Sequence, residues 1–192
     1  MIMKYFPFVV SVFALTILLF VPLSEAWAQV VHDEAPMNHG TMGTEDKAVP
    51  DLERAFLSMM IPHHVAAVEM SKFVLPLAQD PQVITWAEDI IVAQEEEIAL
   101  MESWLEERGG YDEEARHMME EEMAMMMDLL HGDTDPERSF VEHMIPHHLG
   151  AVEMALPVLV RSEDEAMLVL ARDIIATQAE EIYRFKLWLL DR

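Results

Sequence analysis

The chain has 192 residues, a formal net charge of −24 at pH 7 and no cysteine. So acidic a chain argues against nucleic-acid binding, because contacts to phosphate need Lys and Arg. The lack of cysteine excludes disulfides and thiolate metal ligands, which leaves the 17 methionines as the soft donors of the chain.

The N-terminus has the pattern of an export signal. Lys4 precedes an almost wholly apolar stretch over residues 6–23, and Ala26 and Ala28 supply the small residues that a cleavage site needs. We therefore predict a signal peptide over residues 1–28, a periplasmic or secreted protein, and no membrane contact after cleavage. An uncleaved anchor is the alternative, because the apolar run is long enough to span a bilayer when tilted. Residues 29–50 show no periodicity and predict a flexible tail.

An internal repeat organises the rest of the chain. Residues 51–108 align with residues 135–192 at a constant offset of 84 without a gap, and 27 of the 58 aligned positions are identical. Each copy reads as two amphipathic helices, the first ending near residue 78 or 162. We expect an aspartate N-cap at the start of each helix: Asp51, Asp80, Asp135 and Asp164. Gly109 and Gly110 should end the second helix of the first copy.

The region between the copies, residues 109–134, predicts a helix of another kind. From Asp112 to about His131 it is acidic on one side and rich in methionine on the other. Two duplicated helical hairpins can bury their apolar stripes against each other, with this Met-rich helix as the long connection. The sequence therefore predicts an all-α protein with a four-helix bundle.

One pentapeptide occurs in both copies, Met-Ile-Pro-His-His. On a helical wheel, His63 and His147 lie in the middle of the buried stripe, while His64 and His148 lie at its border. The proline before each pair, Pro62 in the first copy, indicates either a functional kink or the start of a new helix.

Histidines flanked by methionines suggest a soft-metal site. Thioether and imidazole together suit Cu(I), and by extension Ag(I), whereas zinc prefers thiolate, imidazole and carboxylate. The proposed ligands are the following: His63, His64, Met60, Met70, His147, His148, Met144 and Met154. Four polar residues on the second helices should orient the histidines: Gln94, Glu97, Gln178 and Glu181. The alternative is that each histidine is a hydrogen-bonded core residue.

The Met-rich helix offers a secondary group of metal ligands. Six of the ten residues from Met118 to Met127 are methionine. The candidates are His117, Met119, Met123 and Met126. The competing interpretation is core filling, because methionine is a good helix former that adapts to irregular gaps.

The repeated pattern resembles the domain-of-unknown-function 305 family, whose signature combines Met-Ile-x-His-His with a later Gln-x-x-Glu-Ile and a Trp-Leu pair. The matching residues in the first copy are Phe56, Met60, Ile61, His63, His64, Ala67, Val68, Met70, Gln94, Glu97, Ile98, Trp104 and Leu105, and their counterparts in the second copy match again. The resemblance implies a ferritin-like helical fold, export to the bacterial cell envelope and, for some members, copper binding. Phe185 departs from the repeat where the first copy has Met101.

These patterns favour an exported protein that binds Cu(I) or Ag(I) for copper buffering, delivery or resistance, with a copper-handling partner in the envelope. A structural or interaction module without metal is the alternative. We expect no enzyme. Di-iron chemistry needs Glu-x-x-His on two helices, and we find this pattern only between Glu114 and His117, outside the repeats. The sequence leaves the metal's oxidation state, the stoichiometry and the oligomeric state open.

Overall fold

The computed structural model describes residues 45–131 and 134–192, and within these ranges the chain forms helices and no strands. The helices are α2 (Glu45–Val74), α3 (Pro81–Glu107), α4 (Glu113–His131), α5 (Pro136–Arg161) and α6 (Glu165–Leu190). The predicted signal peptide and most of the predicted tail lie outside the described residues. In the described part of the chain, no helix combines the length and the apolar character that a bilayer span requires.

Helix boundaries follow the capping chemistry of the sequence. The Asp80 carboxylate accepts a hydrogen bond of 2.8 Å from the backbone N–H of Gln82, and Asp164 accepts one of 2.9 Å from Ala166. Asp135 caps α5 with Pro136 in its first turn. Gly109 and Gly110 follow α3 with φ angles of 89° and 82°, a region that favours glycine. These predicted boundaries are confirmed.

The start of α2 differs from the prediction, and one of the two alternatives for Pro62 is excluded. The helix begins at Glu45, so Asp51 lies inside it rather than at its N-cap, and residues 45–50 are helical rather than part of a tail. It also runs without interruption through Pro62, so no helix starts there. The buried stripe continues on both sides of the proline, and its burial offsets the missing backbone hydrogen bond. In the second copy, α5 likewise contains Pro146 and Pro157.

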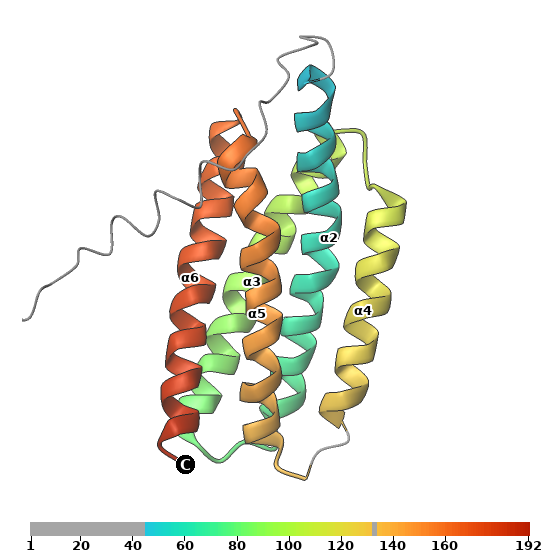
Figure 1. Cartoon of the computed structure of the whole chain (residues 1–192). Helices are drawn as coiled ribbons and strands as arrows, with labels where there is room; N and C mark the ends of the chain where they lie inside the picture. The colour runs from blue at the N-terminus through green and yellow to red at the C-terminus, as the bar shows by residue number, and fades with distance from the viewer. Residues whose placement is uncertain (1–44, 132–133) are drawn as a thin grey trace, which may run out of the picture. The chain divides into compact units, whose positions relative to one another are not determined.

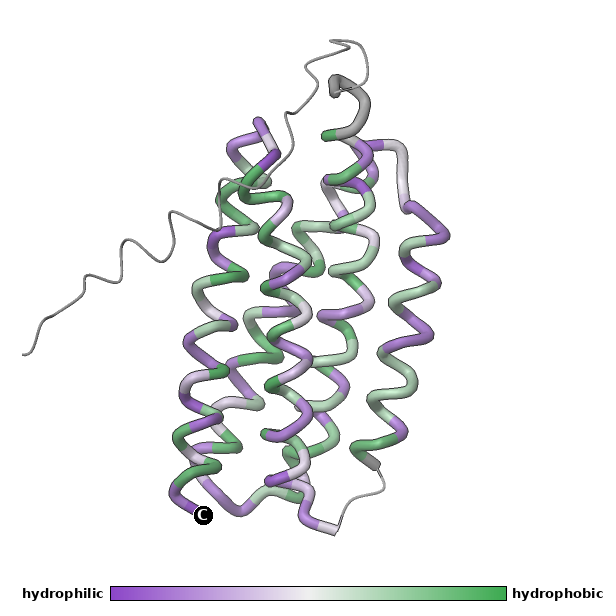
Figure 2. Tube along the Cα trace, viewed as in Figure 1, coloured by the Kyte–Doolittle hydropathy of each residue, from purple (hydrophilic) through white to green (hydrophobic). Residues whose placement is uncertain are grey.

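The helices pack as two hairpins joined side by side. α2 packs against α3, α5 packs against α6, and α2 meets α5 between them. α4 lies outside these four helices and contacts α2 and, to a lesser extent, α5 (Figure 1). Along each helix, hydrophobic positions alternate with hydrophilic ones (Figure 2), which is the pattern of helices that bury one face. The predicted bundle with its connecting helix is confirmed.

The core consists of two main clusters, and each draws on both copies of the repeat. The first contains Phe56, Leu57, Met60, Ile61, Met101, Leu105, Ala151, Ala155, Val158, Met167, Leu170, Ala171 and Ile174. The second contains Ala67, Met70, Val74, Val83, Trp86, Ala87, Ile90, Leu130, Phe140, Val141, Met144, Phe185 and Trp188. The start of α2 therefore packs with the end of α5, and the end of α2 with the start of α5. This exchange is what an antiparallel pseudo-twofold arrangement of the copies produces.

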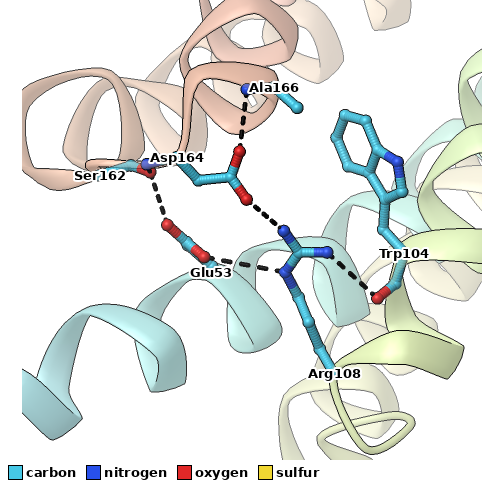
Figure 3. Close-up of polar contacts among 6 residues, drawn as sticks. All are labelled: Glu53, Trp104, Arg108, Ser162, Asp164 and Ala166. Carbon is cyan, nitrogen blue, oxygen red and sulfur yellow. Dashed lines mark hydrogen bonds and ion pairs between the residues drawn. The ribbon is translucent and has the colours of Figure 1, made fainter.

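A polar network closes one end of the bundle (Figure 3). Nη2 of Arg108 lies 2.5 Å from Oδ2 of Asp164, and its Nε lies 3.8 Å from Oε2 of Glu53. The hydroxyl of Ser162 donates a hydrogen bond of 2.5 Å to Glu53, which is only 7% exposed. The network therefore joins α2, the end of α3 and the connection between α5 and α6.

The opposite end carries a related network built from equivalent residues. Arg192 forms an ion pair with Asp80, and Nε1 of Trp188 donates a hydrogen bond of 3.0 Å to the same carboxylate. The carboxylate of Glu137, the counterpart of Glu53, accepts a bond of 2.6 Å from the backbone N–H of Asp80. Both ends of the bundle are thus closed by an arginine and an aspartate N-cap from different copies.

Candidate metal centre

His63 and His147 meet between the two core clusters. Their ring centroids lie 3.7 Å apart with an interplanar angle of 37°. Nε2 of His147 donates a hydrogen bond of 3.0 Å to the backbone carbonyl of His63. The two residues are 2% and 1% exposed, so the predicted burial of this pair is confirmed. The duplicated motif thus brings one imidazole from each copy into direct contact.

His64 and His148 are also buried, which corrects their predicted place at the border of the stripe. Both are 0% exposed. Nε2 of His64 lies 2.7 Å from Oε2 of Glu97, and Nε2 of His148 lies 2.7 Å from Oε2 of Glu181. The second contact is as short as the first but less well aligned as a hydrogen bond. A helical wheel describes one helix alone, and on it these two histidines lie at the edge of the buried stripe. In the folded protein α3 and α6 pack over that edge and bury them.

These contacts determine which ring nitrogens remain free to bind a ligand. A carboxylate and a backbone carbonyl can only accept, so His64 and His147 carry their protons on Nε2. Their Nδ1 atoms then hold a lone pair. Nδ1 is buried without a hydrogen-bond partner in all four histidines: His63, His64, His147 and His148. Unpartnered buried nitrogens are costly in a core, and a bound cation would satisfy them.

The central pair is held neutral. Burial, together with the neighbouring His64 and His148, lowers the pKa of His63 to about 3, while a backbone hydrogen bond to His147 opposes the shift. Burial also lowers the pKa of His147 well below its ordinary value, with His63 as the second cause. Neutral imidazole is the form that coordinates metals, so the ligands need no deprotonation before binding.

The glutamines contribute differently from what we predicted. Gln94 and Gln178 are 3% and 2% exposed, and their Oε1 atoms have no hydrogen-bond partner, so the histidines are oriented by Glu97 and Glu181 instead. Together these side chains line a cavity of about 20 Å³ between α3 and α6. Glu97 and Glu181 are 25% and 18% exposed, so they connect the buried histidines to the surface.

The flanking methionines are divided between the core clusters. Met60 is fully buried in the first cluster, whereas Met70 and Met144 are fully buried in the second. Met154 is half-buried, and it packs against the first cluster and against methionines of α4. The structure therefore distributes the predicted sulfur ligands on both sides of the histidine pair.

The secondary candidates on α4 separate into two groups. The His117 side chain is 70% exposed and lies 3.4 Å from Glu121, so it points away from the bundle. Met119 and Met123 are 8% and 6% exposed and form a third small cluster with Ala66. Met126 packs against that cluster. The histidine and the methionines of this helix therefore cannot act on one ligand together.

Sequence reasoning missed one residue near these groups, Gly150. A Cβ at Gly150 would lie 3.4 Å from Nε2 of His63, so the glycine leaves space beside that ring. Its counterpart in the first copy is Ala66, and this difference within the repeat could have identified it. Met59, a possible soft ligand that the repeat exchanges for His143, packs against the small cluster of Ala66, Met119 and Met123, and this contact depends on where α4 lies.

The donor set fits a soft monovalent cation better than a hard divalent one. Within residues 45–131 and 134–192, no three His, Asp or Glu side chains are grouped as a metal site. The described residues therefore offer no cluster of hard ligands of the kind that a divalent ion prefers. Cu(I) and Ag(I) accept few ligands and prefer imidazole and thioether, and one positive charge among neutral rings is less costly to bury than two.

Known proteins resemble this chain over most of its length. Residues 53–189 match the family model described as Domain of unknown function (DUF305), and this single match takes in both copies. CopM in the Cu(I)-bound form is 31% identical with a TM-score of 0.62, covering 72% of this chain and 96% of that chain. CopM has also been solved in Ag-bound, Cu(II)-bound and apo forms.

Two further relatives extend the comparison. A DUF305 fragment from Deinococcus radiodurans is 33% identical with a TM-score of 0.59, covering 73% of this chain and 97% of that chain. Uncharacterized protein L153 of Acanthamoeba polyphaga mimivirus is 43% identical over 56 residues, 29% of this chain. The match spans 37% of that protein, well under half of its length. The extent of the family match shows that this chain belongs to the DUF305 family.

Proposed function

We propose that this protein is an exported binding protein for Cu(I) or Ag(I), with the paired histidines of its core as the principal site. The observation that carries the proposal is the set of four buried imidazoles whose Nδ1 atoms have no partner. Glu97 holds the ring of His64 in one tautomer, and Glu181 lies equally close to the ring of His148. A carboxylate beside a metal-binding histidine raises the basicity of that ring.

The likeness to CopM supports the same chemistry. That protein has been solved with Cu(I), with Ag and with Cu(II), and it covers most of this chain at about one-third identity. The predicted signal peptide adds export to the cell envelope. Copper buffering, delivery or resistance are the roles that a protein with this binding site and this location would serve, and delivery implies an envelope partner.

The decisive experiment is a Cu(I) titration of the purified protein against a competing chromophoric chelator. We expect stoichiometric uptake with a dissociation constant far below micromolar. A His63→Gln/His147→Gln variant should lose this affinity, and His117→Gln, on the exposed face of α4, is the matched control. Sub-stoichiometric uptake, or affinity in the micromolar range or weaker, would contradict the proposal. Unchanged affinity in the double variant would exclude the central pair.

A structural module without metal is the second candidate. The bond from His147 to the His63 carbonyl favours it, because this bond ties α2 to α5 without any ligand. It predicts that Ag(I) leaves the melting temperature unchanged. A ligand that binds the native state must raise it, by an amount that grows with ligand concentration. Thermal unfolding of the protein with and without Ag(I) therefore separates the two candidates.

A further inference from the structure

We propose that the methionines between α2, α4 and α5 form a second, thioether-only site for Cu(I) or Ag(I). Met119 and Met123 of α4 are buried there against Ala66. Met59 of α2, Met126 of α4 and Met154 of α5 pack against this cluster. Five sulfur-bearing side chains from three helices thus meet in one place, and we call them the methionine cluster.

The methionines of α4 lie on two different faces of the helix. Met119, Met123 and Met126 recur at intervals of four and three residues, which places them on one side of the helix. Met118 and Met125 lie on the other side and are 57% and 64% exposed. The same residue type is therefore present in both environments on one helix, which provides an internal control for any effect of methionine itself.

Core filling alone does not explain why the methionine cluster contains so many methionines. Leucine packs a helix interface more specifically than methionine, whose flexible chain defines a core poorly. The buried α2 member of this cluster is a small residue, Ala66, which takes up less space between the thioethers than a larger side chain would. Thioethers are neutral, soft donors, so they discriminate in favour of monovalent copper and silver over divalent cations.

The cluster also has access to solvent. A cavity of about 280 Å³ between α2 and α4 is lined by Met123 and Met127 together with the carboxylates of Glu69 and Glu120. Arg116 lines it as well, but its charge is compensated, since it lies 2.9 Å from Glu113 and 3.6 Å from Glu120. The remaining negative charge favours the approach of a cation to the sulfur atoms.

The repeat does not duplicate this site. The counterpart of Met59 is His143, whose Nδ1 lies 2.8 Å from the backbone oxygen of Ser139. The counterpart of Met154 is Met70, which is fully buried in the second core cluster. The proposal therefore predicts one methionine site per chain. It does not depend on the histidine site, and the two can fail separately.

The test follows Ag(I) binding at the sulfur atoms themselves. In purified protein with ¹³C-labelled methionine methyl groups, Ag(I) should shift the resonances of the methionine cluster and leave those of Met118 and Met125 in place. A Met119→Leu/Met123→Leu/Met126→Leu variant should bind one Ag(I) fewer per chain than wild type. A Met118→Leu/Met125→Leu variant should bind the full number. Leucine nearly conserves the volume of methionine, so packing is retained.

The histidine variant separates the two sites. In His63→Gln/His147→Gln, the resonances of the methionine cluster should still shift with Ag(I). The proposal is overturned if the triple variant binds as many Ag(I) ions as wild type, or if the exposed methionines shift as strongly as those of the cluster. If the triple variant unfolds, Met123→Leu alone serves the same purpose, and an unchanged Ag(I) stoichiometry and affinity in it would equally overturn the site.

Discussion

Nε2 of His147 donates a hydrogen bond to the backbone carbonyl of His63 across the contact between the two copies. This bond ties the His147 ring to the backbone of α2, and the two imidazole rings lie in contact beside it. It also directs the Nδ1 lone pair of His147 away from the bond, where it has no partner among the described residues. The same side chains therefore hold α2 to α5 and remain able to bind a soft ion.

The metal-free protein should lose stability in mild acid. The pKa of His63 is about 3 in the folded protein, whereas its ordinary value, which applies to the unfolded chain, is 6.5. Between these pH values the unfolded state binds more protons, so the free energy of unfolding falls as pH decreases. The slope is about 1.4 kcal/mol per pH unit for each such histidine. Urea unfolding at a series of pH values from 7 downward measures it.

The His63→Gln/His147→Gln variant is the comparison for this pH series. Its unfolding free energy should depend less on pH than that of the wild type between the two pKa values. Carboxylates contribute equally to both proteins and cancel in the difference. Parallel curves for wild type and variant would contradict the depressed pKa values.

Removing the charge of the two orienting carboxylates should weaken metal binding without abolishing it. In Glu97→Gln/Glu181→Gln, the amide retains the size of the carboxylate but withdraws its negative charge from His64 and His148. We expect the affinity for Cu(I) to fall about 10- to 100-fold. The control is Glu96→Gln/Glu180→Gln, which removes the same charge one residue earlier on α3 and α6. An equal loss in both variants would indicate an effect of overall charge alone.

The two terminal arginines should differ in their contribution to stability. Arg108 is 22% exposed and lies beside Glu53, whose side chain is 9% exposed, whereas the equivalent Arg192 is 45% exposed. Arg108→Met leaves a nearly buried carboxylate with its cation removed, which should cost about 2 kcal/mol. Arg192→Met should cost less than about 1 kcal/mol. Thermal unfolding of both variants shows which one loses more stability. A larger loss of stability in Arg192→Met would contradict the stronger role of Arg108 in the network of Figure 3.

Gly150→Ala should stabilise the metal-free protein. A glycine inside α5 costs up to about 1 kcal/mol relative to alanine. The added Cβ would lie 3.4 Å from Nε2 of His63, which is close but reaches only a side chain. Urea unfolding measures the gain, and Ala66→Gly at the equivalent position should show a loss of similar size. A destabilised Gly150→Ala would show that the space beside His63 is needed.

Local rules predicted the helices well and the site only in part. The caps at Asp80 and Asp164 and the stop at Gly109 follow from the chain near each residue. The burial of His64 depends on a glutamate 33 residues away on another helix, so a single-helix wheel cannot find it. The methionine cluster likewise depends on which face of the bundle α4 covers.

The interlocked cores also make the two copies depend on each other. Each core cluster is completed by residues from the other copy, so a single 58-residue copy would bury neither half until it met a second one. On one chain the two copies meet intramolecularly, so their association does not depend on protein concentration. α4 has no counterpart among the other described helices and packs mainly on α2, so it makes the two halves of the bundle unequal. The histidine pair therefore draws one residue from each copy, whereas the methionine cluster belongs to the side of the bundle that α4 covers.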